Sequence, residues 1–249
     1  MTLKDKLKII FLFLSFAFCK AQNIGQKSIP TITSLNISRY EYDKDILGKE
    51  ENYKSLKWLV LRDSIMITVP KTINNLPKLE RLILRGGKFV NTDSLFTDLS
   101  HSTTLQELYL NNINVNFNES ILKLKNLKDL SLNNCKLTFE GDVFSKSRIS
   151  FLIIRGKLSE NELQIISKND FIDTVYLEDE NTRFPYELSE MKNLELLTLV
   201  DLVSGKYEIS GFKNLKMINL PTRHDVEIKF IDNPNVKINL LKVSKYELD

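Results

Sequence analysis

The sequence predicts an α/β solenoid, a curved right-handed coil with about ten short parallel strands along its concave face. Two observations predict this fold. Pairs of apolar residues separated by one residue recur along the chain, with steps of 20 to 26 residues between successive pairs. A third apolar residue precedes most pairs by three positions, as Leu127 precedes Leu130 and Leu132. Because stacked units share one interior, each unit must repeat the same apolar positions.

Each pair predicts one strand, because alternation along an extended chain turns both apolar side chains to the same face. The pairs are Leu35 and Ile37, Leu59 and Leu61, Leu82 and Leu84, Leu108 and Leu110, Leu130 and Leu132, Leu152 and Ile154, Val175 and Leu177, Leu197 and Leu199, Ile218 and Leu220, and Ile238 and Leu240. Ten parallel strands at the usual spacing would form a sheet roughly 45 Å across.

Between the strands, the chain should return along the opposite, convex wall as short helices, 3-10 turns or extended segments. The stretch SENELQII, residues 159–166, is the most helical of these segments. Ser159 and Glu162 have the spacing of a capping box, and Leu163 and Ile166 would then face the interior.

The stretch from Leu127 to Leu137 resembles the repeat of the leucine-rich repeat family, L-x-x-L-x-L-x-x-N/C-x-L, at every position. The resemblance covers roughly residues 32–243, and the linking stretches VPKTINNLPKL and FPYELSEMKNL also look like the family. It implies a leucine-rich repeat solenoid whose concave strand face commonly serves for binding. Of the residues at the N/C position only Cys135 conforms, so we expect irregular turns after the strands.

The first 21 residues have the composition of a secretory signal peptide. Lys4, Lys6 and Lys8 precede an apolar run over residues 9–18, which is too short to span a bilayer. We expect cleavage after Ala21; a buried N-terminal helix and a lipoprotein acylated at Cys19 are the alternatives. Residues 22–249 would form a single repeat domain, with 22–34 as a cap or lead-in and 242–249 as a short tail.

Export to the periplasm, the cell surface or the medium follows from this interpretation, and the richness in Lys, Asn and Ile suggests a bacterial source. Four lysines against Asp5 give the segment the same net charge as the whole chain, +3. The remainder is therefore neutral, which offers no electrostatic case for binding nucleic acid or an anionic membrane.

No enzyme and no cofactor are expected. Cys19 and Cys135 are the two cysteines, so the mature chain could form no internal disulfide. One cysteine with the distant His101 and His224 cannot build a metal site of the Cys and His type. The sequence contains no glycine-rich phosphate loop, and its Asp-Ser and Asp-Thr pairs lie near no histidine. These pairs (Asp63-Ser64, Asp93-Ser94 and Asp173-Thr174) resemble a weak O-glycosylation signal instead.

The residues that flank the apolar pairs would point away from the core and form three columns on the concave face. Aromatic, arginine and aliphatic residues gather in these columns, and Trp, Tyr and Arg dominate interface energetics. The candidate partner-binding residues are Trp58, Arg62, Arg81, Arg85, Tyr109, Phe151, Ile153, Arg155, Tyr176 and Leu196. Packing between strands is the competing explanation, because sheets favour aromatic and branched residues without any ligand.

The leading hypothesis is an exported, non-catalytic module that binds a protein, or else a glycan, on its concave face. The alternative is a self-associating structural or adhesion component of the cell envelope. In that case two chains would meet as a homodimer at the solenoid ends, since only residues 242–249 follow the last predicted strand. An inhibitor or immunity protein directed at an enzyme is a third hypothesis.

Overall fold

The computed structural model describes residues 32–38, 53–62, 69, 71–86, 94–179, 183–221 and 226–241. The expected signal peptide, most of the lead-in and the tail over 242–249 lie outside these residues. The pair Asp63-Ser64 and the residue Asp93 also lie outside them.

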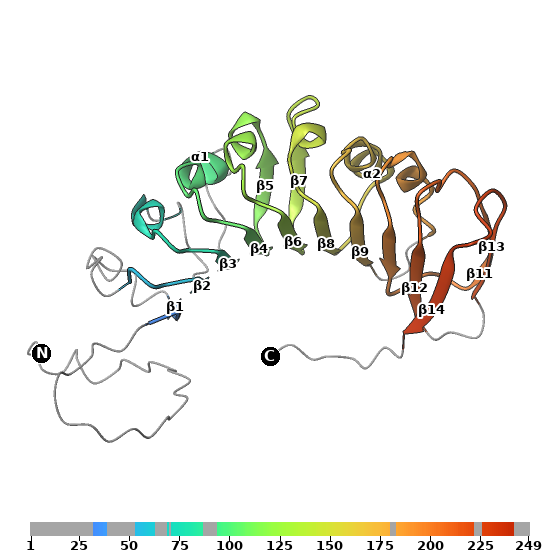
Figure 1. Cartoon of the computed structure of the whole chain (residues 1–249), viewed down its shortest axis with the longest axis horizontal. Coiled ribbons are helices and arrows are strands. Elements are labelled where there is room, and N and C mark those ends of the chain that lie inside the picture. Colours follow the sequence, from blue (N-terminus) through green and yellow to red (C-terminus); the bar gives the residue numbers. More distant parts are fainter. Residues whose placement is uncertain are drawn as a thin grey trace, which may run out of the picture.

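The described part of the chain contains one sheet of ten parallel strands, which follow one another in chain order. They are β1 Ser34–Ser38, β2 Trp58–Arg62, β3 Arg81–Arg85, β4 Glu107–Asn111, β6 Asp129–Asn133, β8 Phe151–Arg155, β9 Thr174–Glu178, β10 Leu196–Leu199, β12 Met217–Pro221 and β14 Lys237–Leu241. Figure 1 shows these strands along the inner side of an arc. The predicted α/β solenoid and all ten predicted strands are confirmed.

The outer wall of the arc combines short helices with two small parallel sheets (Figure 1). The helices are η4 Lys71–Asn75, α1 Leu95–Leu99, η6 Glu119–Lys123, η7 Phe144–Lys146, α2 Glu160–Ser167 and η8 Tyr186–Glu190. The sheets pair β5 Asn114–Phe117 with β7 Lys136–Phe139, and β11 Gly205–Ile209 with β13 Val226–Phe230. The predicted capping box is present in α2, where Ser159 and Glu162 bond each other's backbone N–H groups.

The paired apolar residues of the strands form the core. From Ile37 to Leu220 every one is at most 6% exposed, while Leu35 is partly buried. Phenylalanines fill the space behind the central strands: Phe117 stacks on Phe96 and Phe139 and meets Phe144 edge-on. At β14 the corresponding residues Ile238 and Leu240 are 46% and 59% exposed. The shared interior therefore extends from β1 to β12.

The turns that follow β3, β4, β6 and β8 differ from the expectation of irregular turns. Each begins with a residue of positive φ directly after the strand, namely Gly86, Asn112, Asn134 and Gly156. Glycine and asparagine tolerate this conformation better than other residues. The N–H of each donates to the carbonyl of the last residue of the next strand, at 2.7–3.0 Å. Four successive turns thus share one geometry, and the expectation is wrong for them.

Asparagines also link the units at positions that we did not predict. Asn126, Asn193 and Asn214 each precede an inward leucine, and each side chain donates to a backbone carbonyl of the preceding unit. The fully buried Asn169 donates to the carbonyls of Phe144 and Ser147, at 2.7 and 3.1 Å. At the N/C position itself, the partly buried Cys135 donates its thiol to the Leu110 carbonyl, at 3.3 Å.

Candidate binding face

The parallel register aligns the first, third and fifth residues of the strands, which flank the apolar pairs, into the three predicted columns. Trp58, for example, lies opposite Ser34 on one side and Arg81 on the other. The first column contains the candidates Trp58, Arg81, Phe151 and Leu196; the middle column contains Tyr109, Ile153 and Tyr176; the third contains Arg62, Arg85 and Arg155. Trp58 and Arg62 are exposed and the other eight candidates are partly buried. All ten alternate with buried core residues.

Four residues on β2, β3 and β4 form what we call the Arg81 cluster: Trp58, Arg81, Glu107 and Tyr109. The Arg81 guanidinium lies 4.6 Å from the ring centroid of Trp58 and 5.6 Å from that of Tyr109. Its Nε forms an ion pair with Glu107 Oε2, which also accepts a 3.1 Å hydrogen bond from the Tyr109 hydroxyl. The hydrogen bond to Glu107 raises the pKa of Arg81, and burial raises the pKa of Tyr109. The cluster therefore holds an exposed tryptophan in place.

Three residues on β8 and β9 form a second group, the Arg155 cluster: Arg155, Tyr176 and Glu178. Arg155 Nε lies 2.8 Å from Glu178 Oε2, and its guanidinium lies 5.3 Å from the Tyr176 ring centroid. The Tyr176 hydroxyl donates to the same carboxylate at 3.1 Å. Burial is the largest cause of the raised pKa of Tyr176. The polar tip of Tyr176 is thus already bonded within the sheet.

Arg62 and Arg85 lie at the other end of their strands from Trp58 and Arg81, four residues further along. The three candidate arginines on β2 and β3 therefore lie in two places on the face. Arg81 contacts the tryptophan ring, whereas Arg62 and Arg85 lie opposite each other in the third column. Burial and the charge of Arg62 lower the pKa of Arg85.

The apolar candidates Phe151, Ile153 and Leu196 do not lie next to one another in a single column. Ile153 lies opposite Tyr176, but Thr174 separates Phe151 from Leu196 in the first column. Both Phe151 and Leu196 are partly buried. This part of the face offers partly buried apolar area rather than one exposed patch.

Three acidic residues of the face were absent from the predicted site. Glu107 and Glu178 bind the arginines of the two clusters. Asp129 follows Glu107 in the first column, and its pKa is raised by burial and by the charge of Glu107. Alignment of the columns could have revealed the ion pairs, because each Arg has a Glu at the same position of the next strand.

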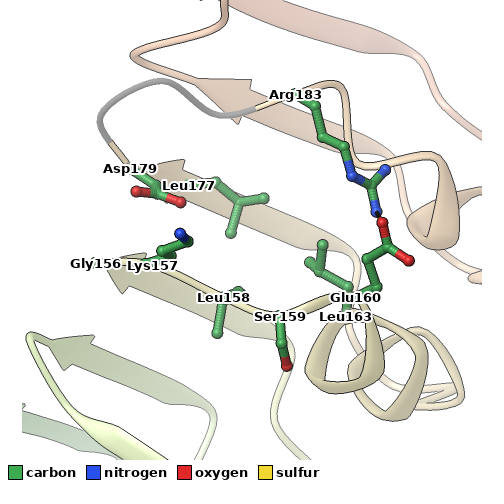
Figure 2. A pocket seen from close by; sticks show the side chains of 9 residues that line it. All are labelled: Gly156, Lys157, Leu158, Ser159, Glu160, Leu163, Leu177, Asp179 and Arg183. Atoms are coloured by element: carbon green, nitrogen blue, oxygen red, sulfur yellow. Dashed lines mark ion pairs between the residues drawn. The ribbon is translucent and has the colours of Figure 1, made fainter.

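A hollow of about 370 Å³ lies beside the ends of β8 and β9, outside the ten candidates. It is lined by Gly156, Lys157, Leu158, Ser159, Glu160, Leu163, Leu177, Asp179 and Arg183. Figure 2 shows Arg183 reaching toward Glu160, with which it forms an ion pair of 3.2 Å. Leu158, Leu163 and Leu177 supply apolar surface between these charged groups.

Within the described residues, no group of three or more His, Cys, Asp and Glu side chains is placed to hold a metal ion. In the same part of the chain, none of the helices has the length and apolar character needed to cross a membrane.

No protein-family model matches the sequence, and no curated protein is significantly similar to it. Solved structures do resemble it. A leucine-rich repeat protein of Leptospira interrogans has a TM-score of 0.50 and 20% identity, over 85% of this chain and 56% of that one. TLR13, in its complex with the RNA ssRNA13, has a TM-score of 0.55 and 19% identity, over 86% of this chain and 33% of that one.

This chain thus spans about half of the Leptospira protein and a third of TLR13. The likeness extends over most of the present chain and agrees with the observed sheet of ten parallel strands. The protein has the leucine-rich repeat fold.

Proposed function

We propose that this protein is an exported, non-catalytic binding module that captures a protein partner on its concave strand face. The Arg81 cluster is the observation that carries this proposal. Trp58 is 48% exposed, yet the Arg81 guanidinium covers one region of its ring at 4.6 Å. A large aromatic side chain is thereby ordered on a rigid sheet while much of its surface still contacts water.

A Trp58 side chain that is already ordered in the free protein favours binding for an energetic reason. Immobilising a flexible side chain at an interface costs about 0.5–1.5 kcal/mol, and this cost is reduced when the side chain is already held. The ion pair with Glu107 and the flanking Tyr109 hold Arg81, and Arg81 in turn holds Trp58. Tryptophan, tyrosine and arginine are the residue types that most often dominate interface energy.

A protein partner fits this face better than a nucleic acid does. TLR13 was solved with an RNA, but on the present face Arg81 and Arg155 are already neutralised by glutamates. A glycan, which could stack on Trp58, is the alternative class of partner. The proposed export rests on the composition of residues 1–21.

The test compares partner capture by three variants of the mature protein. Wild-type protein is used to isolate a partner from envelope or secreted extract, and the affinity for that purified partner is then measured. Trp58→Ala should weaken the affinity by about tenfold or more, as expected for a central aromatic contact, and Tyr176→Ala should weaken it less. Phe171→Ala is the matched control, because Phe171 is 49% exposed but lies outside the ten strands.

Circular dichroism should show the same melting temperature for Trp58→Ala and wild type, since this exposed side chain contributes little to the core. Unchanged affinity in both Trp58→Ala and Tyr176→Ala would contradict the proposal. Equal loss in the Phe171→Ala control would place the contact elsewhere.

Self-association is the second candidate, and one observation favours it. The core-facing positions Ile238 and Leu240 of β14 are 46% and 59% exposed. Two copies that meet at this strand would bury both residues in an isologous contact. Light scattering tests this: a dimer that dissociates in an Ile238→Ser, Leu240→Ser variant supports it, and a monomer at high concentration contradicts it.

A further inference from the structure

Two arginines lie side by side on the concave face. Arg62 on β2 lies opposite Arg85 on β3 in the parallel register, and neighbouring strands are about 4.7–4.9 Å apart. Among the described residues, no carboxylate forms an ion pair with either guanidinium, and the buried Nε of Arg85 has no hydrogen-bond partner.

The two other arginines of the concave face show what is missing. Arg81 and Arg155 each bind a glutamate at the same position of the next strand. At that position relative to Arg85 the chain has Asn111. Asn133 follows on β6, so hydrogen-bond donors occupy this column on four adjacent strands.

This arrangement is unfavourable in the free protein. Like charges directly opposite each other on neighbouring strands destabilise a sheet. Buried polar atoms nearly always have a hydrogen-bond partner, so an unpartnered guanidinium nitrogen requires an explanation. Burial and the proximity of Arg62 both disfavour the charged form of Arg85, as its lowered pKa indicates. An anion bound by both guanidinium groups would relieve the repulsion between them and favour the charged form of Arg85.

We propose that Arg62 and Arg85 together bind a carboxylate of the protein partner, with the Asn111 amide beside them. This inference rests on the proposed function and identifies the chemistry of the partner: an acidic side chain at this edge of the face. Guanidinium groups suit it, because their planar N–H pairs match the two oxygens of a carboxylate.

A single carboxylate fits better than a nucleic-acid backbone. A chain of phosphates needs a continuous basic stripe. Here the opposite ends of the neighbouring strands β4 and β6 carry Glu107 and Asp129, which would repel a second phosphate. The positive site is therefore confined to one edge.

The first experiment uses hexaglutamate as the probe, on the whole mature protein at low ionic strength. NMR of the arginine Nε–H groups follows binding, and the signal lost in Arg85→Gln identifies Arg85. Hexaglutamate should shift this signal, and the double variant Arg62→Gln, Arg85→Gln should lower the peptide affinity about tenfold or more. Arg148→Gln is the matched control, because Arg148 is exposed and lies outside the strands; it should change the affinity less than about twofold.

Two further binding measurements distinguish a carboxylate from a free phosphate and from a nucleic acid. Inorganic phosphate should shift the Arg85 signal more weakly than hexaglutamate, and oligouridine should bind more weakly than the peptide. Tighter binding of oligouridine with a steep dependence on salt would overturn the proposal in favour of a nucleic acid. Equal hexaglutamate affinity in the double variant and wild type would also overturn it.

The second experiment supplies the carboxylate from within the protein. Arg62→Glu would place a glutamate beside Arg85 on the neighbouring strand, at the spacing of the two native Arg–Glu pairs. It should raise the melting temperature above that of Arg62→Gln, which removes the repulsion without adding a pair, and it should abolish the response to hexaglutamate. No gain over Arg62→Gln, together with unchanged peptide binding, would refute the proposal.

The purified partner separates this inference from the proposed function. If Trp58→Ala weakens partner binding but the double arginine variant does not, the carboxylate site is wrong and the binding face stands. If neither variant weakens it, the proposed function itself fails.

Discussion

The Arg81 and Arg155 clusters share three residue types in the same bonding pattern, yet their surroundings differ. In each, an arginine binds a glutamate of the next strand, and a tyrosine donates to that carboxylate. Only the Arg81 cluster adds an exposed tryptophan, Trp58. The Arg–Glu–Tyr pattern is thus a way of packing polar groups on a curved sheet, and the exposed aromatic ring distinguishes the stronger candidate for contact.

The two clusters also lie at opposite edges of the face. Arg81 and Glu107 occupy the first outward position of their strands, whereas Arg155 and Glu178 occupy the third. From β2 to β9 there are five strand steps, or roughly 24 Å. A partner that touched both clusters would therefore cross the sheet diagonally.

The largest expected effect comes from the core that supports both clusters. Leu132 lies on β6, between the strands of the two clusters, and is 2% exposed. Leu132→Ala should lower the free energy of unfolding by about 2–5 kcal/mol, because it leaves a cavity. Chemical denaturation measures this loss, with the exposed Lys136→Ala as a near-neutral control. Unaltered stability would contradict the inward placement of the strand leucines.

A smaller effect distinguishes the two ion pairs. The side chains of Arg81 and Glu107 are 29% and 23% exposed, against 32% and 38% for Arg155 and Glu178. Glu107→Gln should therefore cost about 1 kcal/mol of stability, and Glu178→Gln should cost less, because water screens the more exposed pair. Parallel denaturation curves test the order, and the reverse order would show that Trp58 and Tyr109 hold Arg81 without the carboxylate.

The smallest effect concerns pH and involves Asp129, beside the Arg81 cluster. Its pKa is raised by burial and by Glu107, so the folded protein binds this proton more tightly than the unfolded chain does. The stability from this proton is present at low pH and is lost as pH rises through the folded pKa. Asp129→Asn should therefore raise the melting temperature slightly at neutral pH and have little effect near pH 3.5. A lower melting temperature at neutral pH would show that Asp129 makes a favourable contact as a charged group.

Much of this architecture was predictable because a repeat is a one-dimensional feature. The recurrence of apolar pairs predicted all ten strands of the concave sheet and the register that aligns Trp58 with Arg81. It also placed the ten candidates in their columns. The capping box at Ser159 and Glu162 was predictable as well, since it depends on residues three apart.

Other features were missed because they occur at positions of the repeat other than the N/C position. The asparagines that link the units were sought at the N/C position, but they occur directly before the inward leucines, as in Lys125-Asn126-Leu127 and Lys192-Asn193-Leu194. The shared turns were missed because the residue of positive φ, such as Asn112 or Asn134, comes earlier than that position. Both regularities are present in the sequence, as asparagine directly before an inward leucine and as asparagine or glycine directly after a strand.

The sequence alone determined the ten strands of the concave sheet, their order and which of their side chains leave the core, because alternation and burial are set by residue spacing along the chain. The aligned columns indicate which charges could meet, but only the tertiary structure decided which of them do. Arg81, Arg155 and Arg85 all occupy outward positions, and the first two contact a glutamate while the third faces another arginine. The physical reason is that charge pairing is a property of neighbouring strands at a distance of a few ångströms, whereas hydrophobic periodicity is a property of each strand by itself.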